Sequence, residues 1–169
     1  MRVQTFDITI ATAKDAQDLA FIHAESWSSA YLGILPGCAL NRAISKRGPN
    51  WWKNSIEKGL RVLIIKFAGK TVGYATIGTS RVKWSVPAGE VYELYLLPVY
   101  QGLGLGRKLL KAASSKLQDL GYQAMLLWCL EENRAGCDFY EHVKGTAIAK
   151  AHEKFEGKKV LKTGFAWRL

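Results

Sequence analysis

The sequence predicts an α/β protein with one central mixed β-sheet of about seven strands, flanked by helices on both faces. Three observations support this fold class. Short apolar runs typical of strands alternate with segments of helical periodicity. The stretch Val91–Leu110 reads as a strand, a glycine-rich turn and a helix. The chain has 169 residues, of which 49% are hydrophobic, enough to bury a sizeable core. We therefore expect residues 1–169 to form a single domain.

The N-terminal third is predicted to contain one strand and three helices. Residues Phe6–Ala11 alternate between apolar and polar side chains, as in a half-buried strand. Thr12 followed by Asp15 has the spacing of a capping box and predicts where the first helix begins. The segment Arg47–Pro49 separates the second helix from the third. The predicted helices span Ala13–Trp27, around Cys38–Ser45, and Trp51–Lys58.

The rest of the sheet is predicted from six further strands. The first three follow one another through short connections, with a hairpin turn at Ala68–Lys70, so they are predicted to be antiparallel neighbours. A helix crosses from the third to the fourth, which predicts that these two run parallel. The last two form a hairpin about Glu156–Lys158. The predicted strands are Val62–Phe67, Thr71–Thr79, Gly89–Leu97, Ala124–Leu130, Thr146–Phe155 and Val160–Arg168.

The turn after the strand Val91–Leu97 has the composition of a ligand cradle. Pro98 cannot donate a ladder hydrogen bond, so the strand ends there. The glycines Gly102, Gly104 and Gly106 let the backbone turn sharply and let a ligand approach the main-chain N–H groups. These features indicate a binding site built from the backbone.

The helix after this turn indicates that the ligand is anionic. It is predicted to begin at Leu105 or Gly106 and to end at Leu120. Arg107 and Lys108 stand in its first turn, where the helix dipole disfavours cations unless an anion is bound. The dinucleotide fingerprint G-x-G-x-x-G fails by one residue, and the Walker pattern lacks its Gly-Lys-Ser/Thr. A different phosphate ligand is therefore indicated.

Two motifs resemble the GNAT superfamily of acetyl-CoA-dependent N-acetyltransferases. The run Gln101–Gly106 matches Q/R-x-x-G-x-G/A after a strand that ends in proline. In the second, Asn133 follows a strand and precedes a short helix, Arg134–His142, that carries Phe-Tyr-Glu. The family usually continues with Gly-Phe, whereas this chain reads His142–Thr146. The order of strands and helices matches over essentially the whole chain.

The resemblance implies a coenzyme A site between two central parallel strands that splay apart. The pantetheine arm is expected to pair with the backbone of the first of these strands, and the glycine loop to hold the pyrophosphate. The implied cofactor-binding residues are Tyr95, Leu96, Leu97, Gln101, Gly102, Leu103, Gly104, Leu105, Gly106, Arg107, Asn133 and Tyr140. No metal is expected.

The acceptor pocket is expected beside the helices that follow the first strand, because these wall it in the superfamily. Trp27 and Tyr31 are the aromatic candidates there, and Glu90 is an acidic candidate. Glu90 and Glu93 are three residues apart in a strand, which predicts that they face opposite sides. His23 lies on the apolar stripe of the first helix and is predicted to be a hydrogen-bonded core or pocket-wall residue.

The expected reaction is direct attack of a primary amine on the thioester of acetyl-CoA in a ternary complex. The amine must lose a proton, and Glu93 is the favoured base, with Glu90 or water left open. Tyr140 stands where relatives protonate the leaving thiolate, and main-chain N–H groups near Leu96 are expected to polarise the carbonyl. An acyl-cysteine relay is disfavoured. Two alternatives remain: a catalytically silent acyl-CoA sensor and a basic nucleic-acid-binding module.

Composition restricts the partners. Lys and Arg total 24 against 14 Asp and Glu, a net charge of +10, which favours anionic ligands. These charges are spread along the chain, so no nucleic-acid partner is expected, and no apolar run suggests a membrane partner. Three cysteines without a spacing motif fit a reducing, cytoplasmic location. The expected partner is a small-molecule or peptide amine, with polyamines ranked lower, and a homodimer is left open.

Overall fold

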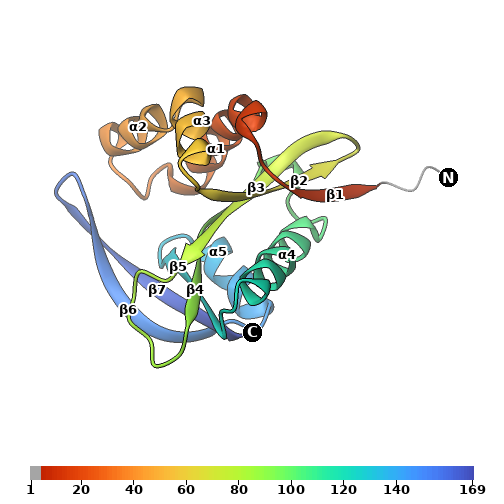
Figure 1. The fold of residues 1–169 in the computed structure, drawn as a ribbon. Helices are drawn as coiled ribbons and strands as arrows, with labels where there is room; N and C mark the ends of the chain where they lie inside the picture. The colour runs from red at the N-terminus through yellow and green to blue at the C-terminus, as the bar shows by residue number, and fades with distance from the viewer. Residues whose placement is uncertain (1–4) are drawn as a thin grey trace.

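The computed structural model describes residues 5–169, which form a seven-stranded sheet with helices on both faces (Figure 1). The strand order across the sheet is β1-β2-β3-β4-β5-β7-β6. The strands are β1 (Phe6–Ile10), β2 (Arg61–Phe67), β3 (Lys70–Thr79), β4 (Ala88–Leu96), β5 (Ala124–Leu130), β6 (Thr146–Phe155) and β7 (Lys158–Arg168). The α-helices are α1 (Ala16–Tyr31), α2 (Gly37–Lys46), α3 (Pro49–Glu57), α4 (Leu105–Asp119) and α5 (Arg134–His142).

The predicted fold class, a mixed sheet covered on both faces, is confirmed. Every predicted strand and helix is present, with bounds that differ by a few residues. The capping box at Thr12 forms, with its backbone N–H donating to Asp15 Oδ2 at 2.7 Å. It opens a short 3₁₀ turn that leads into α1, and α1 continues four residues past the predicted end at Trp27. No helix within residues 5–169 is long and apolar enough to cross a membrane.

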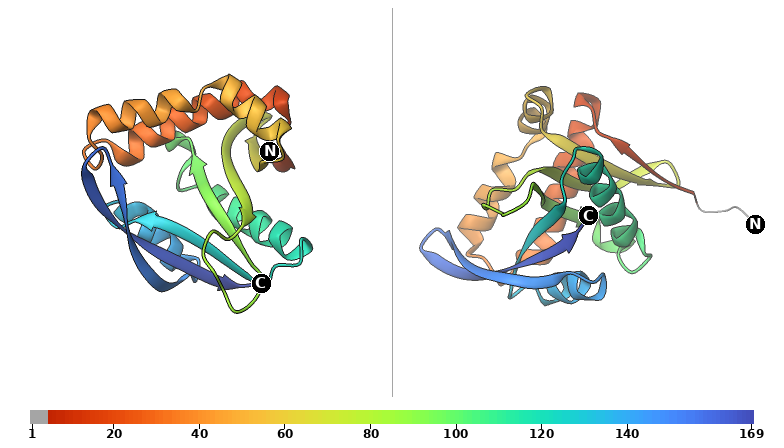
Figure 2. Two further views of the ribbon diagram at one scale, coloured as in Figure 1. Left: turned by 60° about the vertical axis from the view of Figure 1, so that its left-hand side comes forward. Right: turned by 60° about the horizontal axis from the view of Figure 1, so that its bottom comes forward.

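Helices α1, α2 and α3 lie over one face of the sheet, and α4 and α5 lie over the other (Figures 1 and 2). The larger buried cluster fills the space between the sheet and α4, with Leu109, Leu117 and Val91 fully buried. A second cluster lies between the sheet and α1 with α3, around Trp52 and Tyr74. This burial accounts for the helical stripes read from the sequence, because an amphipathic helix must cover its apolar face.

The centre of the sheet opens where β4 and β5 separate. These are the only parallel neighbours among the described strands, and they pair only from Ala88–Glu90 against Ala124–Leu126. Beyond that point β4 runs on to Leu96 and β5 to Leu130 without a partner on the facing edge. Figure 2, left, shows the two strands diverging. The backbone groups that face the opening therefore have no partner in a neighbouring strand.

A β-bulge in β4 overturns the predicted orientation of two glutamates. Thr76 pairs with Glu93 and Gly78 pairs with Glu90, which leaves Tyr92 as an extra residue in β4. Thr76 and Gly78 are two residues apart and share a face, so their partners share it too. The prediction that Glu90 and Glu93 face opposite sides was therefore wrong, because the bulge shifts the alternation by one residue.

Candidate active site

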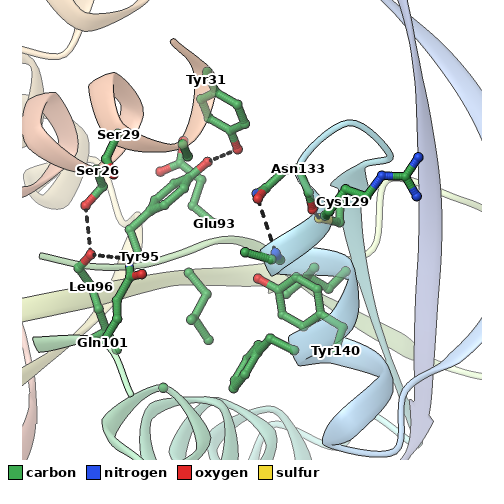
Figure 3. A pocket seen from close by; sticks show the side chains of 18 of the residues that line it. Ser26, Ser29, Tyr31, Glu93, Tyr95, Leu96, Gln101, Cys129, Asn133 and Tyr140 are labelled. Atoms are coloured by element: carbon green, nitrogen blue, oxygen red, sulfur yellow. Dashed lines mark hydrogen bonds between the residues drawn. The ribbon is translucent and has the colours of Figure 1, made fainter. Parts of the chain in front are cut away.

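A cavity of about 730 Å³ occupies the opening between β4 and β5, and we call it the inter-strand cavity (Figure 3). Its walls come from α1, β4, the glycine loop, β5 and α5. The lining residues include Ser26, Tyr31, Tyr92, Glu93, Tyr95, Leu96, Gln101, Gly102, Gly104, Gly106, Arg107, Cys129, Asn133, Gly136 and Tyr140. Because the strand edges diverge here, the cavity is bounded by unpaired backbone as well as by side chains.

The glycine loop forms the end of the cavity where an anion is predicted to bind. Gly104 has φ +77° and is the N-cap residue of α4. The first intrahelical bond runs from Lys108 N–H to the Gly104 carbonyl at 3.3 Å. The three preceding N–H groups of Leu105–Arg107 therefore have no helical acceptor. With the helix dipole and the Arg107 side chain, these donors are suited to an anionic group.

The two cations of the α4 first turn have different surroundings. Arg107 lines the inter-strand cavity. Lys108 is not among its lining residues, and its Nζ lies 4.3 Å from the ring centroid of Phe6 in β1. The sequence did not separate them because both stand in the first turn of the helix, and the ring that Lys108 contacts lies about a hundred positions earlier in the chain. Of the two cations, Arg107 is therefore the one that faces the cavity, and its contact with a phosphate stays a prediction.

Three of the expected cofactor residues have side chains outside the cavity. Leu103 is 54% exposed, whereas Leu105 is buried in the core beneath α4. The Leu97 side chain is buried against the α1 face of the sheet, and its N–H donates to the Val72 carbonyl at 2.8 Å. None of the three lines the inter-strand cavity, so Leu103 and Leu105 can contribute through their main chain alone. That contribution stays a prediction.

The end of β4 is tied to its surroundings through one carbonyl group. The Leu96 carbonyl accepts hydrogen bonds from Ser26 Oγ and from Gln101 Nε2, each at 3.3 Å. Figure 3 shows both bonds at the edge of the cavity. Gln101 therefore holds the start of the glycine loop against β4. This contact connects the strand edge to the glycine-rich turn.

Tyr140 stands on α5 on the opposite side of the cavity from α1. Its ring packs against Phe139, Phe165 and Trp167, with centroid distances of 5.2, 5.7 and 6.3 Å. Figure 3 shows its hydroxyl directed into the cavity, with no hydrogen bond drawn to it. Burial raises the pKa of Tyr140 well above its ordinary value. The hydroxyl is therefore protonated at neutral pH and available as a donor.

Asn133 supports the helix that carries Tyr140. Its Oδ1 accepts a hydrogen bond from Gly136 N–H at 3.2 Å and caps α5 (Figure 3). The side-chain amide N–H₂ is not used in this cap. Asn133 also lines the cavity, so it combines a structural role with access to a ligand.

Glu93 lies at the centre of a buried polar network. Its carboxylate accepts hydrogen bonds from Arg47 NH1 at 2.9 Å and from the Tyr74 hydroxyl at 3.2 Å. The Tyr74 hydroxyl also lies 3.0 Å from His23 Nδ1. Burial raises the pKa of Glu93, and Arg47 partly opposes that shift. A carboxylate whose pKa is raised holds a proton better than an ordinary glutamate, as general-base catalysis requires.

His23 is a buried member of this network, as predicted from its place on the apolar stripe. Burial lowers its pKa from 6.5 to about 4, and the nearby positive charge of Arg47 adds to the effect. The imidazole is therefore neutral at pH 7. It orients Tyr74, which in turn orients Glu93.

The residues expected at the acceptor pocket occupy three different environments. Tyr31 lines the cavity, and its hydroxyl lies 2.7 Å from that of Tyr95 (Figure 3). Trp27 does not line the cavity and packs behind Tyr31, with ring centroids 4.9 Å apart. Glu90 is fully buried and pairs with Arg81 at 2.6 Å. Its side chain does not line the inter-strand cavity and is bound by Arg81 instead.

A second cavity, of about 470 Å³, shares Tyr92 and Glu93 with the first. It lies on the α3 side of β3 and β4, and we call it the cationic cavity. Its lining residues are Arg47, Trp51, Ser55, Lys58, Leu60, Thr76, Arg81, Tyr92 and Glu93. Glu93 therefore lies at the boundary between the inter-strand cavity and the cationic cavity.

Several of these residues escaped sequence analysis because their partners are distant in the chain. The sequence indicates Arg47 only as part of a helix break, yet it pairs with a glutamate 46 positions later. Tyr74 meets His23 across 51 positions, and Ser26 meets Leu96 across 70. No local pattern signals such contacts. The bulge at Tyr92 likewise could not be predicted, because no glycine or proline stands at that position.

The two cysteines near the inter-strand cavity do not form an activated nucleophile. Cys129 lines the inter-strand cavity and Cys137 lies on the adjacent helix α5. Burial raises the pKa of both thiols, so they are protonated at neutral pH. Within the described chain, no group of three or more His, Cys, Asp or Glu side chains is placed to hold a metal ion.

Comparison with known proteins places this geometry in a family. The sequence profile of the Acetyltransferase (GNAT) family matches residues 23–145. The protein named N-acetyltransferase YuaI of Bacillus subtilis is 30% identical over 162 residues, covering 95% of this chain and 92% of YuaI. The spermidine N(1)-acetyltransferase of Thermoplasma acidophilum is 26% identical over 137 residues, covering 80% of this chain and 85% of the relative.

Solved structures show the same fold. The PaiA N-acetyltransferase of Thermoplasma acidophilum, crystallised with coenzyme A, superposes with a TM-score of 0.77 at 19% identity. The match covers 98% of this chain and 99% of that one. The family match spans both the glycine loop and the helix of Tyr140. Acetyl-CoA is accordingly the acyl donor, and the chain belongs to the GNAT family of acetyltransferases.

Proposed function

We propose that the protein transfers the acetyl group directly from acetyl-CoA to a primary amine while both are bound. The observation that supports this most is the position of Glu93 and Tyr140. Both line the inter-strand cavity, one from β4 and the other from α5. The cavity between them is continuous with the glycine loop. A thioester bound with its pyrophosphate at the loop would therefore present its carbonyl between a candidate base and a candidate acid.

The chain offers distinct groups for each part of the donor. The free N–H groups of the α4 first turn and Arg107 would hold the pyrophosphate. The unpaired edge of β4 would bind the pantetheine amides, and Asn133 lies close enough to the cavity to contribute its side-chain amide. Tyr95 and Leu96 would provide the main-chain groups nearest the reacting end. Bound acetyl-CoA supplies an activated carbonyl and a thiolate leaving group.

The reaction requires one proton to be removed and another to be supplied. A free alkyl ammonium titrates near about 10.4, so most of the acceptor arrives protonated. Glu93 takes this proton, directly or through water, and the neutral nitrogen then forms the new C–N bond. As the C–S bond breaks, Tyr140 donates its hydroxyl proton to the departing sulfur, and the proton that the newly acylated nitrogen loses returns through water to the Tyr140 oxygen. The products are the N-acetylated amine and coenzyme A.

The proposal is tested by removing the Tyr140 hydroxyl alone. Tyr140→Phe keeps the ring and its packing, so acetyl-CoA affinity should change little. Because acid–base groups contribute about 10²–10⁴-fold, kcat should fall at least about tenfold when chemistry limits the rate. Tyr122→Phe is the matched control, since that hydroxyl bonds to Thr79 and lines neither cavity.

The measurement also decides between the enzyme and the alternative of an acyl-CoA sensor. Release of free thiol is followed with a panel of primary amines, and acetyl-CoA binding is measured by calorimetry. A protein that binds acetyl-CoA but releases no thiol with any amine would be a sensor. A kcat of Tyr140→Phe within about twofold of wild type would reduce Tyr140 to a packing residue.

A further inference from the structure

The cationic cavity is separate from the donor site but opens at the same residue, Glu93. It is bounded by α3, by the end of β3 and by the bulged part of β4. Trp51 and Tyr92 give it aromatic walls, whereas Ser55 and Thr76 give it hydroxyl groups. At about 470 Å³ it has room for a small molecule. An acceptor amine that reaches Glu93 from this side would leave the rest of its body here.

The charges around this cavity are predominantly positive. Three cations line it, Arg47, Lys58 and Arg81, against a single lining carboxylate, that of Glu93. Glu90 lies close by and is paired with Arg81. Adding this buried carboxylate still leaves the surroundings with an excess of one positive charge.

The two arginines are held in fixed positions by aromatic rings. The Arg47 guanidinium carbon lies 4.2 Å from the Trp51 ring centroid, and that of Arg81 lies 5.0 Å from the Tyr92 centroid. Arg47 bonds to its glutamate through NH1, whereas Arg81 uses Nε and NH2. Each guanidinium has five N–H donors, so each retains donors beyond those its glutamate receives.

Lys58 has no comparable structural role. It lies just past the end of α3 and takes part in none of the ion pairs formed by residues 5–169. It nevertheless lines the cavity beside the two arginines. An ammonium and two pre-positioned guanidinium groups around one space form a receptor for a carboxylate.

We propose that the acceptor is an amino acid, a primary amine that also carries a carboxylate. The carboxylate binds to the three cations of the cationic cavity, and the amine reaches Glu93 at its boundary with the donor site. This inference rests on the proposed acetyl transfer at Glu93. The product is the N-acetyl amino acid. A polyamine is disfavoured, because its second ammonium group would enter surroundings that already carry an excess of one positive charge.

The first experiment compares amines that differ only in the carboxylate. L-Leucine is assayed against isopentylamine, and L-phenylalanine against phenethylamine, with thiol release as the readout. We expect kcat/KM to be at least roughly tenfold higher for each amino acid, the contribution of one strong charge-assisted contact. Equal or higher kcat/KM for the decarboxylated amines would overturn the inference.

The second experiment removes one cation without disturbing a buried pair. Lys58→Gln should raise KM for the amino acid roughly threefold or more and leave KM for the decarboxylated amine unchanged. Lys53→Gln is the matched control, because it makes the same charge change on α3 outside the cavity. Equal effects of the two variants, or an equal effect of Lys58→Gln on both members of a pair, would count against the carboxylate site.

A binding measurement separates failure of this inference from failure of the proposed function. L-Leucine and L-phenylalanine are titrated calorimetrically into the coenzyme A-loaded protein. Binding that Lys58→Gln weakens, without thiol release from acetyl-CoA, would leave the amino-acid site standing and refute acetyl transfer. Acetylation of amines with no preference for those that carry a carboxylate would support acetyl transfer and refute the amino-acid site. If no amino acid binds and none is acetylated, the inference is wrong.

Discussion

Gly104 offers the sharpest test of the donor site, because its effects on folding and on binding can be separated. Its φ of +77° lies in the left-handed region, where a side chain costs roughly 1–2 kcal/mol. A Cβ built at this position meets no other atom within 4 Å, so a side chain adds backbone strain but no clash. For a chain of this size that strain lowers Tm by roughly 2–8 °C. The fold should therefore survive Gly104→Glu.

The effect on coenzyme A should be much larger, because the added carboxylate stands where the pyrophosphate is expected. At about 5 Å from two phosphate charges, repulsion amounts to roughly 1.7 kcal/mol even at the dielectric constant of water. This corresponds to a factor of roughly 15 in affinity, and a less polar environment increases it. Gly104→Ala carries the strain without the charge and should bind coenzyme A within about threefold of wild type.

The matched control is Gly69, at the tip of the β2–β3 hairpin. It has φ +82°, it also has nothing within 4 Å of a built Cβ, and it does not line the inter-strand cavity. Gly69→Glu should lower Tm to a similar extent and leave acetyl-CoA affinity intact. Affinity is measured by calorimetry and folding by circular dichroism. Unchanged affinity in Gly104→Glu, or equal losses in both glutamate variants, would refute the placement of the phosphate.

Three further predictions concern charge and protonation. Arg107→Ala should weaken coenzyme A binding and make the remaining affinity less sensitive to salt, whereas Lys108→Ala should do neither. An equal loss of affinity for pantetheine, which has no phosphate, would exclude an electrostatic cause. Because the pKa of Glu93 is raised, kcat should fall as the pH decreases, with a midpoint above the ordinary glutamate pKa of about 4.3. If Glu93→Gln keeps the same fall in kcat at low pH, another group is the base. The folded state holds His23 at a pKa of about 4, so protonation favours the unfolded state below about 6.5. His23 alone should lower the free energy of unfolding by roughly 2 kcal/mol at about pH 5 relative to about pH 7. Measured by urea unfolding, the wild type should lose that much more stability over this range than His23→Gln; equal slopes would contradict it.

The elements of this protein could be predicted from sequence because their signals are local. A strand that ends at Pro98, a turn rich in glycine and an amphipathic helix are each specified within a few residues. The N-cap residue Asn133 predicts where the helix that carries Tyr140 begins. The same short-range motifs resemble the family and so point to the loop at Gly104. The glycine loop and the start of α5 could therefore be predicted from the sequence, because local backbone conformation defines both.

The surroundings of the candidate base were decided by tertiary structure alone. A β-bulge at Tyr92 turns Glu90 and Glu93 to the same face, against the period of two that the sequence implies. Arg47 then pairs with one of these glutamates and Arg81 with the other. Alternation predicts which face a side chain occupies only while strand pairing is regular. Contacts between residues dozens of positions apart form only when the sheet brings α1 and α3 over β4, so no local pattern encodes them.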